Sequence, residues 1–119
     1  MSNIIYKICP IELWHQAEAQ GEFMGAPIDI QDGYIHFSTA EQSVETAAKH
    51  FSNQVDLFLI AVDGDKLGDA LKFEVSRGNA LFPHLYAKLK MDAVIWVKPL
   101  PLGDDGMHIF PDFNGNKDT

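Results

Sequence analysis

The sequence predicts an α+β domain with a mainly antiparallel, strongly bent or split sheet and two principal helices. Two helical patterns come early in the chain, and most later segments have the patterns of strands. This order differs from the regular alternation that builds a doubly wound parallel sheet. The length of 119 residues is typical of one domain, which we expect to span residues 1–110. We expect residues 111–119 to form a mobile tail.

The first elements are a strand, a helix and a loop. Residues 4–8 form a short β-type run that Pro10 stops. Apolar residues then recur at approximate helical spacing, which predicts a helix over residues 11–20 that ends at Gly21. The stretch from 25 to 33 is rich in glycine, proline and aspartate and predicts a loop.

The best-defined boundary is the start of the second helix. Residues 34–37 predict a strand, and Thr39 follows with Gln42 three positions later. This spacing is that of a capping box, so we expect a helix from about residue 40 to 51. Its predicted buried stripe consists of Val44, Ala47, Ala48 and Phe51.

The second half of the chain is dominated by strands. The continuous apolar run at 57–62 predicts a buried strand, and the alternation at 71–75 predicts a strand with one wet face. A turn at 77–79 and a last strand at 93–97 complete the predicted order.

Composition excludes several classes of function. The net charge is -8 with only nine basic residues, so phosphate neutralisation on nucleic acid is not expected. Cys9 is the only cysteine, which rules out an intrachain disulfide. No run approaches the roughly 20 apolar residues of a membrane span, and no signal-peptide pattern is present. We therefore expect a cytoplasmic protein without membrane partners.

One candidate segment joins the strand at 34–37 to the following helix. Helix-start amides favour an anionic group such as phosphate, and Ser38 and Thr39 add hydroxyls beside His36. Thr39 is more simply explained as the helix cap, and His36 is equally explained as a structural histidine.

Two further segments carry candidate ligand-binding residues. Arg77, the only arginine, lies beside Gly78 in a turn, where it could bind phosphate or carboxylate through a forked contact or pair with a surface acid. His84 and Tyr86 share a face if their segment is extended, and together they could polarise or stack on a flat ring. Tyr86 could equally be a half-buried edge residue.

Several other residues have simpler explanations. A metal site of His36, His84 and His108 is a third possibility, but no pair has zinc-helix spacing, and we predict no metal. Asp29 and Asp32 are typical of turns. Glu74 is expected on the wetter face of its strand, where a carboxylate could serve catalysis but is more simply explained by solvation. His15 and His50 are expected to face solvent. Walker, Rossmann, nucleophile-elbow and CxxC motifs are absent.

These segments closely resemble domain-of-unknown-function family 952, a family of small bacterial proteins without an assigned activity. The resemblance runs from residues 5–8 to 108–111, and its most specific pieces are 32–42, 74–78 and 81–86. A more distant resemblance is to the ADP-ribosyltransferase-like fold, which holds NAD or ADP-ribose in a cleft between two small sheets.

That distant resemblance implies roles for the candidate residues. Ser38 and Thr39 would line the nicotinamide-ribose site with His36 beside them, Arg77 would meet the pyrophosphate, and His84 or Tyr86 would face the ring. The catalytic glutamate expected near residues 83–86 is missing. The resemblance therefore implies an NAD- or ADP-ribose-handling transferase or hydrolase, or a non-catalytic module that senses such a ligand or a protein partner.

Overall fold

The structure is a computed structural model that describes residues 3–113, apart from the side chain of Arg77. The helices are α1 (Ile11–Gln20), α2 (Pro27–Asp32) and α3 (Ala40–His50), with 3-10 turns at η1 (Gly64–Ala70), η2 (Arg77–Asn79) and η3 (Met91–Ala93). The strands are β1 (Ile4–Pro10), β2 (Glu22–Phe23), β3 (Ile35–His36), β4 (Leu57–Asp63), β5 (Leu71–Val75), β6 (Leu81–Leu85), β7 (Leu89–Lys90) and β8 (Val94–Pro99). Residues 114–119 of the predicted tail lie outside the described residues.

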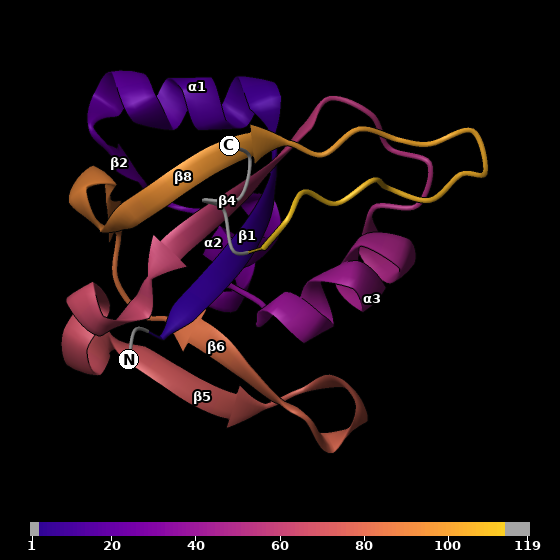
Figure 1. Cartoon of the computed structure of the whole chain (residues 1–119). Coiled ribbons are helices and arrows are strands. Elements are labelled where there is room, and N and C mark those ends of the chain that lie inside the picture. The colour runs from indigo at the N-terminus through magenta and orange to yellow at the C-terminus, as the bar shows by residue number, and fades with distance from the viewer. Residues whose placement is uncertain (1–2, 114–119) are drawn as a thin grey trace.

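Two antiparallel sheets of three strands each form the framework, with strand orders β1-β4-β8 and β3-β6-β5. They meet where Tyr6 in β1 and Ser38 after β3 exchange backbone hydrogen bonds of 2.8 and 2.9 Å. The short strands β2 and β7 pair separately. This arrangement confirms the predicted α+β class with antiparallel, split sheets (Figure 1).

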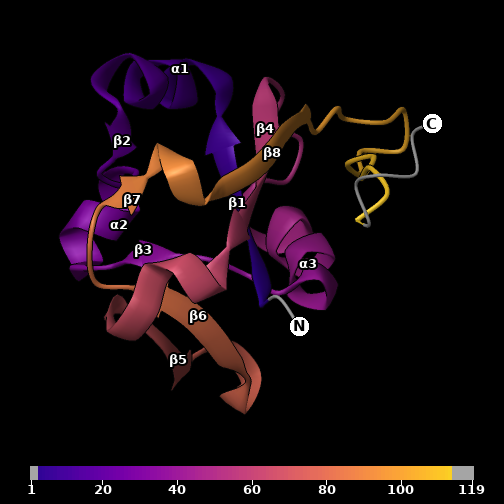
Figure 2. The same ribbon diagram turned by 60° about the vertical axis from the view of Figure 1, so that its left-hand side comes forward.

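The sheet of β1, β4 and β8 has apolar side chains on both faces. One face packs beneath α1 in a core that includes Cys9, Trp14 and Ile60. The other face packs against α3 in a second core that includes Ala47 and Leu59. Figure 2 shows these two helices on opposite sides of the strands. The central strand β4 is therefore buried on both sides, as its continuous apolar run predicts.

Helix α3 begins as the sequence predicts. Thr39 Oγ1 accepts from the Gln42 N–H at 3.3 Å, and Gln42 Oε1 accepts from the Thr39 N–H at 3.0 Å. The predicted stripe is only partly correct, because the buried residues of the helix are Ser43 and Ala47. Val44 is 46% exposed. The small side chains at 43 and 47 let the helix pack closely onto its neighbours.

The predicted loop at 25–33 is wrong, because it contains α2. Pro27 occupies the first turn, where its missing N–H is not needed, and Gly33 ends the helix at φ 89°. Asp29 Oδ2 accepts from the Ala26 N–H at 2.7 Å and so satisfies one free amide of the helix start. The glycine, proline and aspartate residues that suggested a loop are thus the start and stop signals of a short helix.

Candidate functional site

One face of the sheet β3-β6-β5 gathers most of the polar candidates. Side chains alternate across a strand, and the register sets His36 directly opposite His84. Lys72 pairs with His84 and Glu74 with Phe82 in the neighbouring ladder, so these side chains share the same face. The rings of His36 and His84 lie 5.6 Å apart, centroid to centroid. The sheet register therefore brings together two histidines that are distant in the sequence.

Asp29 of α2 is the buried centre of the first cluster. Asp29 is 1% exposed. Its two carboxylate oxygens, Oδ1 and Oδ2, lie 3.0 and 2.9 Å from Nζ of Lys7 in β1. Oδ1 also accepts from the His36 N–H at 3.1 Å and contacts His36 Nδ1 at 2.6 Å. Four donor groups, counting the Ala26 amide, thus join β1, α2 and β3 through one carboxylate.

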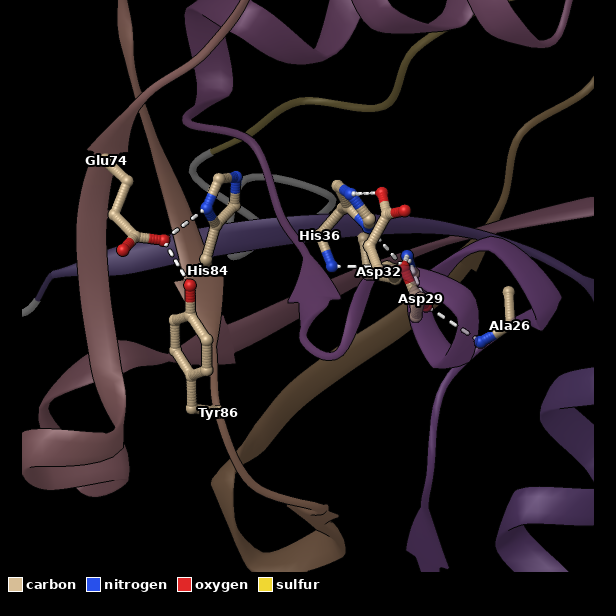
Figure 3. A network of polar contacts seen from close by, with 8 residues as sticks. Ala26, Asp29, Asp32, His36, Glu74, His84 and Tyr86 are labelled. Carbon is tan, nitrogen blue, oxygen red and sulfur yellow. Dashed lines mark hydrogen bonds and ion pairs between the residues drawn. The ribbon is translucent and has the colours of Figure 1, made fainter.

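His36 lies between two carboxylates, as Figure 3 shows. Its Nδ1 contacts Asp29, and its Nε2 lies 3.0 Å from Asp32 Oδ2. A carboxylate can only accept, so the arrangement is fully satisfied when the imidazolium form donates from both nitrogens. The two carboxylates, one on each ring nitrogen, therefore hold the ring in a fixed orientation.

His84 belongs to a second cluster, in which the carboxylate and the tyrosine are partly exposed and the histidine itself is buried. Its Nδ1 contacts Glu74 Oε1 at 2.8 Å, and the same oxygen accepts from the Tyr86 hydroxyl at 2.7 Å (Figure 3). Tyr34 stacks on the His84 ring with centroids 4.2 Å apart. With Nδ1 donating to Glu74, the Nε2 of a neutral His84 is left as a proton acceptor.

A cavity of about 750 Å³ lies against both histidines. Its volume falls within the range of small-molecule sites. Polar and apolar side chains from both sheets, α2 and α3 line it. They are Tyr6, Lys7, Ile8, Ile28, Asp32, His36, Phe37, Ser38, Thr46, His50, Phe51, Ser76, Phe82 and His84.

The electrostatic surroundings set the acidity of three groups in these clusters. Burial alone would raise the pKa of Asp29, but the donors from His36, Lys7 and Ala26 outweigh it and lower the pKa to about 2. The hydrogen bonds from His84 and Tyr86 lower the pKa of Glu74. The hydrogen bond to Glu74 raises the pKa of Tyr86 to about 12. Both carboxylates thus stay ionised, and Tyr86 stays a donor, at neutral pH.

Not all predicted ligand-binding residues reach the cavity. Ser38 lines it, and its Oγ lies 3.2 Å from Thr46 Oγ1. Thr39 serves as the helix cap, and the backbone of Gly78 lies in the η2 turn, neither of them among the lining residues. The predicted contact of Arg77 concerns a side chain outside the described part. These placements leave the phosphate-binding roles as predictions.

Other predicted roles are resolved by position. Tyr86 is 44% exposed and contacts the cluster through its hydroxyl. His50, expected to face solvent, is exposed but also lines the cavity. His108 lies apart, with its Nε2 2.8 Å from the Gln54 carbonyl oxygen. Among residues 3–113, no group of three His, Cys, Asp or Glu side chains is arranged to hold a metal ion.

Sequence reasoning missed five members of the clusters. Lys7 was included only in a short strand, and Asp29 and Asp32 were interpreted as turn aspartates. Glu74 was assigned to solvation, although the β5–β6 register places it on the same face as His84. Tyr34 was included only in a strand. Residues 72, 74 and 76 lie two apart along a strand and therefore share one face. To recognise that this face also carries His84 requires the register between β5 and β6.

The fold and the paired histidine clusters define a small α+β domain with a ligand-sized cavity. The chain matches the family described as "Protein of unknown function (DUF952)" over residues 8–97, and it belongs to that family. No functionally curated protein matches it.

Solved structures with similar sequence and fold come from one bacterial protein. One is the crystal structure of protein CC0527 from Caulobacter crescentus, whose sequence is 47% identical to this chain. The match covers 90% of this chain and 94% of the CC0527 chain, with a TM-score of 0.87. The solution NMR structure of CC0527 matches with 48% sequence identity over 87% of this chain and 90% of the CC0527 chain, with a TM-score of 0.79. The match supports the fold of nearly the whole described chain. In the described part, no helix has the length and apolar character to cross a membrane.

Proposed function

We propose that this domain binds a phosphorylated, nucleotide-like ligand of the NAD or ADP-ribose class in the cavity beside His36 and His84. The observation that carries the proposal is the composition of the cavity wall. Two carboxylate-supported histidines face the same space as aromatic side chains from Tyr6, Phe51 and Phe82. A flat base or nicotinamide ring needs apolar contact surface, while a sugar and its phosphates need a few fixed polar groups.

The polar groups suit a ribose phosphate. Ser38 and Thr46 present hydroxyls that can donate to or accept from a sugar or phosphate oxygen. Protonated His84 can donate to a phosphate from Nε2, and neutral His84 can accept a proton from a ribose hydroxyl. The position of the cavity near the junction of two small sheets also agrees with the distant resemblance to the ADP-ribosyltransferase-like fold.

The charged side chains around the cavity limit the contacts that an anionic ligand can make. Asp32 and Glu74 hold the two histidine rings, and Lys7 is already paired with Asp29. A phosphate therefore has to draw its favourable contacts from the histidine N–H groups and the hydroxyls of the wall.

A non-catalytic sensor of the same ligands is the second candidate. Both nitrogens of His36 already face carboxylates, so this ring positions rather than exchanges protons. Of the two clustered histidines, His84 is then the one that offers a nitrogen for acid–base chemistry. Turnover of NAD or ADP-ribose esters would establish an enzyme, and binding without turnover would establish the sensor.

A thermal-shift and calorimetric screen tests the proposal. The ligands are NAD, ADP-ribose, AMP, ribose 5-phosphate and inorganic phosphate. A ligand at about 100 times its Kd adds roughly 2.7 kcal/mol of stability.

Matched variants separate this site from general effects of charge. His84→Ala should abolish the shift, whereas His15→Ala, which removes a histidine on α1 outside the cavity lining, should retain it. Equal shifts in both variants, or no shift with any phosphorylated compound, would refute the proposal.

A further inference from the structure

Strand β5 forms an edge of the molecule. It pairs with β6 on one side, and no described strand pairs with its other side. Figures 1 and 2 both show β5 at the outer margin of its sheet. Exposed edges offer unpaired backbone groups to another strand. The side chains of β5 therefore determine which kind of strand can pair with this edge.

The outward backbone groups of β5 belong to its odd-numbered residues. The bonds that flank the β5–β6 ladder run from Ser76 N–H to the Ala80 carbonyl (2.9 Å) and from Tyr86 N–H to the Ala70 carbonyl (2.8 Å). These bonds make the even-numbered residues of β5 the ones that bond to β6. Because antiparallel ladders alternate, Leu71, Phe73 and Val75 direct their peptide groups to the open edge. The Leu71 N–H instead bonds to Gly68.

The two faces of β5 differ in character. Phe73 and Val75 are 40% and 65% exposed, and Leu81, paired with Val75, is 52% exposed. These three residues form an apolar patch on one face. Lys72 and Glu74 lie on the opposite face, which carries His84. An added strand must therefore present apolar groups on one side and complementary charges on the other.

We propose that a second copy of this chain adds to β5 in an antiparallel, two-fold symmetric pair centred on Phe73. In this register Phe73 lies opposite Phe73 of the second copy, and Lys72 lies opposite Glu74. The Phe73 pair exchanges both backbone hydrogen bonds, and Val75 N–H donates to the Leu71 carbonyl of the other copy. The interface is isologous, as in most homodimers.

Charge and face together select this register. If the two-fold axis passed through Lys72, the Lys72 side chains of the two copies would lie opposite each other. If it passed through Glu74, the two Glu74 carboxylates would lie opposite each other. Like charges directly opposite are unfavourable in a ladder. A shift by a single residue turns the apolar patch of one copy toward the charged face of the other. Pairing centred on Phe73 satisfies both faces.

The dimer would add a positive charge beside the candidate site. Glu74 holds both His84 and Tyr86 through one oxygen. Opposite side chains in a strand pair have Cβ atoms about 4.5–5.5 Å apart, so Lys72 of the second copy reaches the Glu74 carboxylate. Self-association and the orientation of His84 are therefore coupled through Glu74.

The test uses two charge-reversal variants and their mixture. Sedimentation analysis over a wide concentration range should show wild type passing from the 13.3 kDa monomer to twice that mass. K72E and E74K alone bring like charges together and should each weaken association by roughly tenfold or more. An equimolar mixture should regain wild-type association, because every facing pair is then Glu with Lys.

Two controls keep the result interpretable. K49E changes the same charge on α3, away from β5, and should dimerise like wild type. F73K leaves Glu74 in place and sets two lysines together at the axis, so it should abolish association even if E74K does not fold. The proposal is overturned if wild type remains a monomer throughout, if F73K still dimerises, or if folded K72E and E74K fail to associate when mixed.

Discussion

The two histidine clusters differ mainly in how deeply their carboxylates are buried. The Asp29 side chain is 0% exposed and is surrounded by fixed donors from three elements. The Glu74 side chain is 38% exposed and is shared by only two described partners, His84 and Tyr86. A buried carboxylate must keep every donor, whereas an exposed one can exchange a donor for water.

This difference separates a structural cluster from an adjustable one. Removing Asp29 would leave Lys7, which is only 6% exposed, without its partner. Removing Glu74 leaves the Tyr86 hydroxyl near solvent, while the His84 ring, which is buried, loses its Nδ1 partner. The first cluster should therefore determine folding, and the second should determine the orientation of His84.

The largest expected effect comes from Asp29→Asn. The amide keeps the shape but cannot neutralise Lys7, and breaking a buried ion pair in this way costs about 3–5 kcal/mol of unfolding free energy. Urea unfolding measures the loss. Asp32→Asn, which removes the more exposed partner of the same histidine, should cost about 1 kcal/mol or less. Equal losses in the two variants would show that burial does not distinguish them.

The pH dependence of stability should isolate Asp29. Its folded-state pKa is lowered from 3.8 to about 2, so the unfolded chain binds this proton more readily. The contribution is complete above about pH 4 and is lost as pH falls toward 2, a change of about 2 kcal/mol. Urea unfolding across this window should show a steeper decline in wild type than in Asp29→Asn. Parallel curves would contradict the assignment.

How much of the fold could be predicted from the sequence depends on how far apart in the chain the interacting residues lie. The start of α3 was predictable because Thr39 and Gln42 satisfy each other's backbone groups locally. The strand at 57–62 was predictable from its apolar run. Helix α2 was missed because its six residues carry no apolar periodicity, and its Asp29 acts as a helix-start acceptor that resembles a turn aspartate.

The site depended on contacts that sequence patterns do not specify. His36 and His84 were both candidates, but their adjacency follows from the β3–β6 register. Glu74 joins them only because β5 pairs on the other side of β6. No glutamate lies near residues 83–86 along the chain, but in space Glu74 of β5 contacts His84.

The next effect concerns the acidity of Tyr86. Its hydrogen bond to the Glu74 carboxylate raises the pKa of Tyr86 to about 12, because ionisation would set two negative charges together. Glu74→Ala should return this pKa toward the ordinary value of about 10. Ultraviolet titration measures tyrosinate, and the difference from Tyr86→Phe in each background isolates this residue. A wild-type pKa near 10 would show that the bond does not persist in solution.

The smallest expected effect is that of Tyr34→Leu, which removes the ring stacked on His84 but keeps an apolar side chain. Aromatic contacts of this kind contribute about 0.5–1.5 kcal/mol beyond their buried area, so the unfolding free energy should fall by about 1 kcal/mol. Tyr86→Phe, which keeps its ring and loses only the hydroxyl, provides the matched control. The chemical shifts of the His84 ring protons should change more in Tyr34→Leu than in Tyr86→Phe, because only the former loses the stacked ring current. A larger change in Tyr86→Phe would mean that the bond through Glu74, rather than the stacked ring, orients His84 in the adjustable cluster.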